Sequence, residues 1–196
     1  MMINLIKYLL SILSIALIFP QGNFQILNIP PSTRLLALSN SAHAMSDFTN
    51  SYNPASINST KRNISIHSHI YPADIVYVRS EIILPIYANI YSFEYSNLNY
   101  GEFKDAETDD IFNSSEFLFK GSIKTHIFNK LSIGSSVAYA INKISDEVSQ
   151  ALFISLGLRT QIDNPRLGFG LSVNNIGKII KNFSDYEESL PSSINM

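Results

Sequence analysis

The chain has 196 residues, a formal net charge of −2 and no cysteine. The length suits one ordinary domain, the charge gives no broad electrostatic basis for binding nucleic acid, and the lack of cysteine excludes disulfides and thiolate metal sites. Charged residues make up 15% of the chain, against roughly 25% in soluble domains. Serine and asparagine fill this deficit, so the chain has few of the groups that keep a protein surface soluble.

The first predicted element is a secretory signal peptide over residues 1–22. One lysine, Lys7, precedes an uncharged run from Tyr8 to Phe19. As a helix this run would span about 18 Å, which is short of a ~30 Å hydrocarbon core. A signal peptide therefore fits better than a transmembrane anchor or a buried N-terminal helix. Pro20 and Gly22 end the run, and we expect cleavage near Gly22.

Residues 23–60 predict an N-terminal plug segment that contains a short helix. Pro30 and Pro31 precede the helix, and Ser32 is its expected N-cap. Apolar residues follow at helical spacing and are expected to pack against a core: Leu35, Leu36, Leu38, Ala42 and Met45. Asn53 and Pro54 form a turn dipeptide that ends the helical pattern. The segment is therefore expected to be a short helix with an irregular connector.

Residues 61–196 have a period of two, which predicts β-strands. About seven stretches show it: 63–70, 75–84, 85–101, 115–128, 130–143, 151–161 and 166–177. The connections between them are polar and suit hairpins: GEFKDAETDD, FNK, NKISDEVS and QIDNP. The strands are therefore expected to be consecutive antiparallel neighbours.

The stretch KLSIGSSVAYAINK, residues 130–143, indicates where such a sheet resides. Its odd positions are mostly large and apolar, as in Ile133 and Val137, and its even positions are small, as in Ser132 and Gly134. A soluble sheet shows long charged side chains to water, whereas a membrane barrel turns large apolar groups to lipid and small ones to a crowded lumen. Residues 131–141 would be about 36 Å long, or about 25 Å tall when tilted by ~45°, which matches an outer-membrane apolar band. The predicted fold is therefore an all-β, outer-membrane antiparallel β-barrel.

Other strands place aromatic and charged residues on one face each. Tyr87, Tyr91, Phe93 and Tyr95 share a face of the third predicted strand. The numerous Tyr and Phe residues of the chain suit an interfacial girdle, and packing is the alternative role for several of them. On the fourth strand, one face carries charged or titratable residues that are expected to pair with each other or to hold the N-terminal segment by ion pairs: Glu116, Lys120, Lys124 and His126.

No catalytic constellation stands out, and no catalytic, cofactor-binding or metal residue is assigned. His67 and His69 lie on the same side of a strand, about 7 Å apart, but no acidic residue or cysteine at a matching position accompanies them. Two hydrogen-bonded histidines facing the lumen are therefore favoured over a metal site. The DAETDD stretch lacks the spacing of a calcium loop and is expected to be a solvated hairpin. Asn174 and Asn175, near Gly177, are expected to be turn residues.

Three stretches carry motifs that occur together in one known family. The first runs from Asn28 to Ala55, and its matching residues are Pro31, Ser32, Arg34, Ala37, Leu38, Asn53, Pro54 and Ala55. The second is LNYGEF, residues 98–103, which looks like the end of an early long strand. The third runs from Leu171 to Ile194, and its matching residues are Asn175, Ile176, Gly177, Glu188, Leu190 and Pro191. Together these stretches resemble the PorV/PorQ group of outer-membrane proteins, which is related to FadL-type barrels, and the PorQ side is favoured. Ser39 and Asn40 stand after Leu38, where that family usually has a glycine pair.

The resemblance implies a barrel of about fourteen strands with an N-terminal segment tucked inside it. It also implies a non-enzymatic component of the type IX secretion system in the bacterial outer membrane, which acts by partner binding. The expected partners are outer-membrane lipid and other secretion subunits or secreted cargo, with no cofactor. The alternative is a FadL-like transporter of hydrophobic small molecules. An outer-membrane lipid hydrolase is a third hypothesis. It would need one of the histidines His43, His67, His69 or His126 beside a serine and an acidic residue at one rim.

The matched motifs fall in the earlier half of that family, and they predict that the chain is a fragment of a longer protein. Seven full strands and a short stub after Pro191 are expected. An open half-barrel is therefore predicted, with the N-terminal helix against its concave face.

Overall fold

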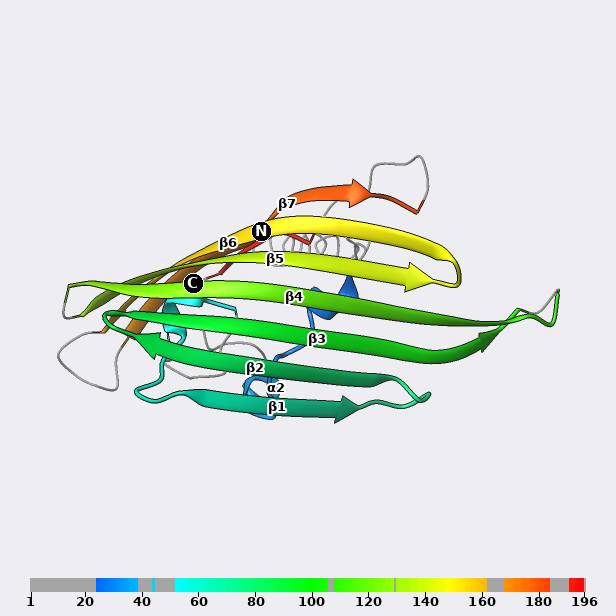
Figure 1. Cartoon of the computed structure of the whole chain (residues 1–196), viewed down its shortest axis with the longest axis horizontal. Helices are drawn as coiled ribbons and strands as arrows, with labels where there is room; N and C mark the ends of the chain where they lie inside the picture. The colour runs from blue at the N-terminus through cyan, green and yellow to red at the C-terminus, as the bar shows by residue number, and fades with distance from the viewer. Residues whose placement is uncertain are drawn as a thin grey trace, which may run out of the picture.

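In a computed structural model, the protein is described at residues 24–38, 44, 52–105, 108–128, 130–161, 168–183 and 191–195. The predicted signal peptide lies outside these residues. One antiparallel sheet dominates, and its strands lie in chain order from β1 to β8 (Figure 1). The strands are β1 (Asn63–Ile70), β2 (Val76–Ile86), β3 (Asn89–Lys104), β4 (Ile111–Phe128), β5 (Leu131–Ile144), β6 (Glu147–Gln161), β7 (Gly168–Lys181) and β8 (Ser193–Asn195). The prediction of about seven consecutive antiparallel strands is confirmed.

The sheet is open. Strand β1 forms one edge and the three-residue strand β8 forms the other, and no pairing among the described residues joins these edges. The expected strand start after Pro191 is present as β8, which pairs with Ser172–Asn174 of β7. Among the described residues, no helix is long and apolar enough to cross a membrane.

Three short elements precede the sheet in the chain: η1 (Gln25–Leu27), α2 (Thr33–Ala37) and η2 (Pro54–Ser56). Of these, η1 and η2 lie against one face of the sheet, which we call the inner face. The predicted N-cap is confirmed, since Ser32 Oγ accepts a hydrogen bond from the Leu35 amide at 3.3 Å. The helix is only five residues long, and Ala42 and Met45 of the predicted apolar stripe lie outside the described residues.

The predicted alternation in β5 is also confirmed. On the inner face, Ser132, Ser136, Ala138 and Ala140 are buried. On the opposite, outer face, Ile133 is 41% exposed and Val137 is 55% exposed. The small inner side chains allow the N-terminal elements to approach the sheet, while the outer face keeps its large apolar groups uncovered.

The structure corrects three local predictions. Tyr87 does not share a strand face with Tyr91, because β2 runs on through Ile86 and Tyr87 lies in the turn with a φ of 53°. Two predicted connections are partly strand, since β3 extends to Lys104 and β5 and β6 are separated only by Ser145 and Asp146.

Asn174 and Asn175 are not turn residues, contrary to the prediction. They lie inside β7, where two residues stand opposite Ser155 of β6 and the register shifts. Asn175 takes a left-handed φ of 59°, a conformation that asparagine tolerates better than most residues. A β-bulge therefore uses the asparagine that local sequence signals assign to a turn.

Candidate functional site

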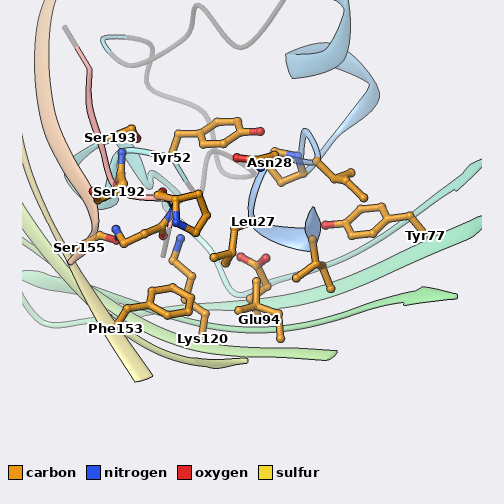
Figure 2. A pocket seen from close by; sticks show the side chains of 17 residues that line it. Leu27, Asn28, Tyr52, Tyr77, Glu94, Lys120, Phe153, Ser155, Ser192 and Ser193 are labelled. Carbon is orange, nitrogen blue, oxygen red and sulfur yellow. Dashed lines mark hydrogen bonds between the residues drawn. The ribbon is translucent and has the colours of Figure 1, made fainter. Parts of the chain in front are cut away.

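The most elaborate part of the molecule is the contact between the inner face and the N-terminal segment, residues 24–38 and 52–57. Three sets of side chains anchor this segment: Glu116, a cluster around Arg79, and a notch at two glycines. The sheet also leaves a cavity beside the segment, which Figure 2 shows from close by.

Glu116 holds the start of η1. Its carboxyl oxygens accept hydrogen bonds from the backbone amides of Gln25 at 3.1 Å and Ile26 at 2.8 Å. Tyr100 Oη donates a third bond to the same carboxyl group at 2.6 Å. The N-cap residue of η1, Phe24, supplies no side-chain cap, so a carboxyl group from β4 satisfies amides that would otherwise be unpaired.

Arg79 of β2 lies at the centre of a buried charge cluster. Its Nη2 atom is 3.0 Å from Glu81 Oε2 and 3.1 Å from Glu94 Oε2. Glu81 and Glu94 stand directly opposite each other in the β2–β3 ladder. Two like charges in that position repel each other, and one guanidinium between them relieves the repulsion.

The same cluster reaches the N-terminal segment. Arg79 Nη1 donates to the Pro31 carbonyl at 3.5 Å, just before α2. Ser96 Oγ donates to Glu94 at 3.2 Å, and Tyr77 Oη donates to Ser96 at 3.3 Å. The guanidinium thus links two strands of the sheet to the segment that covers them.

Gly134 and Gly157 face each other across β5 and β6 and form a notch in the inner face. A Cβ atom on Gly134 would lie 2.3 Å from the Pro54 carbonyl carbon, and one on Gly157 would lie 2.1 Å from Asn53 Oδ1. The Asn53–Pro54 turn fills this notch. Asn53 caps η2 by accepting from the Ala55 amide at 3.0 Å, and its Nδ2 atom donates to the Leu158 carbonyl at 3.2 Å.

The cavity beside the segment has a volume of about 330 Å³. Lys120 and Glu94 lie below Leu27 in the view of Figure 2, and Ser192 and Ser193 line the left side of the cavity beside Ser155. Its lining mixes apolar, amide and hydroxyl groups, including Tyr77, Leu118, Phe153, Ser155, Asn174 and Asn175. The cavity can therefore hold a small molecule with both apolar and polar parts.

The structure places the predicted charged face of β4 as expected, but its role differs in detail. Glu116 holds the N-terminal segment through backbone amides, not through an ion pair. His126 lies within 3.1 Å of Ser132 Oγ. Lys124 is buried on the inner face, and Lys120 lines the cavity.

His67 and His69 lie on the same side of one strand, as predicted, but His126 does not join them at one rim. His67 and His69 share the inner side of β1, and His69 Nδ1 lies 3.5 Å from Tyr71 Oη. In the ladder, His69 is level with Glu116 of β4, which lies ten residues from His126 along the same strand, or roughly 33 Å. His43 lies outside the described residues. Within the described part of the chain, no three histidine or acidic side chains gather to hold a metal ion.

Sequence reasoning missed Arg79 as the central cation. The available signal was the spacing of Arg79 and Glu81, which puts both on one face of a strand otherwise rich in apolar residues. Glu94 is fifteen residues away, and only the strand register brings it to the same guanidinium.

Comparison of the chain with protein-family models, curated proteins and solved structures gives no match.

Proposed function

We propose that this protein is a non-enzymatic outer-membrane β-barrel component of the type IX secretion apparatus, and that it acts by binding partners. The observation that carries the membrane assignment is the apolar outer face of the sheet. The resemblance of three stretches of the sequence to the PorV/PorQ group supports the assignment to secretion.

Large apolar side chains are exposed on the outer face of every long strand. On β6 alone, Leu152, Ile154, Leu156 and Leu158 are between 39% and 50% exposed. Soluble monomers rarely expose contiguous apolar patches of more than a few hundred Å². A hydrocarbon environment removes this difficulty, because large apolar groups are what lipid-facing strand positions require.

The two open edges of the sheet would destabilise it in lipid. Unpaired backbone groups cost several kcal/mol each in a bilayer core, so only a closed ring of strands is stable there. A ring of strands closed between β1 and β8 would remove this cost. The N-terminal segment on the inner face fits such a ring, because it would lie inside the ring as a plug.

Partner binding, rather than a reaction, is the proposed activity. Glu116 and Arg79, two charged groups of the inner face, both contact the N-terminal segment. The resemblance supplies the partner class, which is other secretion subunits or their cargo.

A tagged full chain in a bacterium that carries a type IX apparatus would test this proposal. We expect the protein in the outer-membrane fraction after a high-pH wash, and secretion subunits should co-purify with it in mild detergent. Ile133→Arg, on the outer face, should lower the membrane-inserted fraction. A soluble protein, or a membrane protein that purifies without any secretion subunit, would contradict the proposal.

A FadL-like transporter is the second candidate, and the cavity of about 330 Å³ favours it. Its apolar wall beside Leu27, Leu118 and Phe153 suits the hydrocarbon part of a small molecule. Mass spectrometry of the protein extracted from its native membrane would detect bound lipid. Recovery of the protein free of lipid, together with secretion subunits, would favour the secretion role.

A further inference from the structure

The hairpin of β3 and β4 extends beyond its neighbours in the sheet. Pairing with β2 stops at Asn99, and pairing with β5 stops at Ser114, but Glu102–Lys104 and Ile111–Asn113 continue to pair with each other. Figure 1 shows this hairpin reaching farther than the strands on either side. We call residues 100–105 and 108–113 the projecting hairpin.

An aromatic pair marks one side of the projecting hairpin. Phe103 and Phe112 stand opposite each other, and their rings stack with centroids 5.5 Å apart and planes at 21°. Phe112 is four residues from Glu116, so both belong to the inner side of β4. The pair therefore does not belong to a lipid-facing aromatic girdle. Phe103 is nevertheless 42% exposed, which is unusual for a ring that has no lipid to face.

The charge of the projecting hairpin is strongly negative. Its described residues include four carboxyl groups and one ammonium group, and they therefore carry a formal charge of −3. The ammonium group of Lys104 lies 2.8 Å from Asp109 Oδ1, and both side chains are largely exposed. The carboxyl groups are those of Glu102, Asp105, Asp109 and Asp110. Such a surface attracts cationic groups and repels anionic lipid.

The backbone of the hairpin offers a third element of recognition. Beyond Asn99, the backbone edge of β3 that would face β2 has no strand partner among the described residues. An exposed strand edge can add an extended peptide through main-chain hydrogen bonds, while the side-chain surroundings select its sequence. Gly101, with a φ of +80°, lies beside Ala73 and Asp74, so this free edge begins at Glu102.

We propose that the projecting hairpin is a docking site for an extended, basic polypeptide segment of a partner protein that carries an apolar side chain. The strand edge receives the backbone, the Phe103–Phe112 pair receives the apolar side chain, and the carboxyl groups receive lysine or arginine. This inference names a surface for the partner binding in the proposed function and therefore rests on it.

Fluorescence anisotropy with synthetic peptides and the purified full chain in a neutral detergent tests the inference. The probe is a short labelled peptide in which lysine alternates with serine and one central serine is replaced by leucine. The comparison peptides lack the leucine or carry glutamate in place of lysine. We expect the lysine–leucine peptide to bind about tenfold tighter than either comparison peptide, and less tightly as salt is added.

Two double variants locate the binding. Phe103→Ala with Phe112→Ala, and Asp109→Asn with Asp110→Asn, should each weaken the lysine–leucine peptide about tenfold. Tyr87→Ala is the control for the aromatic pair, because it removes a fully exposed ring at the opposite end of β3, and it should change nothing. The peptide with glutamate in place of lysine is the control for charge. Circular dichroism verifies that each variant keeps its sheet.

Several outcomes would overturn the inference. They are no binding by the unaltered chain, full binding by the phenylalanine variant, or weakening in the aspartate variant alone, which would indicate unspecific attraction of lysine. Hairpin-dependent binding to phosphatidylglycerol vesicles would assign the surface to lipid. Self-association that the phenylalanine variant abolishes would assign the surface to a second copy of the chain. Either result would also overturn the inference. Membrane fractionation of the same chain tests the proposed function separately, because the peptide assay does not require insertion.

Discussion

Gly134 shows how a missing side chain positions the N-terminal segment. A Cβ atom at this residue would overlap the Pro54 backbone, whereas a Cβ on Gly121 would lie 4.0 Å from the nearest atoms of Phe93. We expect Gly134→Ala to destabilise the docked segment by about 1–3 kcal/mol through overpacking. Gly121→Ala should be close to neutral. Trypsin cleavage at Arg34 measures the release of the segment, and equal cleavage rates in both variants would contradict the role of the notch.

Among the inner-face residues, Arg79 is the one whose substitution should lower the free energy of unfolding most. Arg79→Leu would leave Glu81 and Glu94 opposite each other without the guanidinium that neutralises them. We expect it to lower the free energy of unfolding by about 3–5 kcal/mol. Adding Glu94→Gln should restore part of this loss, because one of the two facing charges is gone. Denaturant unfolding of the single and double variants measures the difference, and strictly additive losses would rule out the coupling.

At the scale of elements, η1 depends on a carboxyl group from another part of the chain. Glu116→Gln keeps the side-chain shape but turns an NH₂ group toward amides that need acceptors, so we expect a loss of about 1.5–3 kcal/mol in local stability. Hydrogen exchange at the Ile26 amide is the direct measurement, since that amide donates to Glu116 at 2.8 Å. Glu102→Gln, on the exposed part of β3, is the control. Unchanged protection of Ile26 would mean that Glu116 does not cap η1.

The strands could be predicted because the alternation of side chains within each strand is visible in its own residues. The alternation of Ile133 with Ser132 and Gly134 requires no knowledge of the neighbouring strands, and the cap at Ser32 depends only on residues three positions away. The bulge at Asn175 could not be predicted, because it depends on where β6 places Ser155. The Arg79–Glu94 contact is of the same kind, since it joins residues of two strands through their register.

At the scale of the whole molecule, the two faces of the sheet should respond differently to the same substitution. Ile133→Arg and Leu156→Arg put a charge on the outer face and should cost about 2–4 kcal/mol if these positions lie near the bilayer midplane. Ser136→Arg should destabilise the fold for another reason. Ser136 is only 3% exposed on the inner face, so the position has no room for an arginine side chain.

Membrane insertion into lipid vesicles and folding in detergent micelles separate these two effects. The outer-face variants should be impaired mainly in vesicles, and Ser136→Arg should be impaired in both. Equal tolerance of all three substitutions would show that the assignment of the faces is wrong.

The order of the strands also has a kinetic consequence. Every strand pairs with its neighbour along the chain, so each ladder closes after a short loop and the sheet can assemble one hairpin at a time. The contacts of Asn53 with Leu158 and of Gln25 with Glu116 span 105 and 91 residues, and they form only once β4 to β6 exist. The first residues described in the chain are therefore among the last to settle, and until then the inner face of the growing sheet stays open to water.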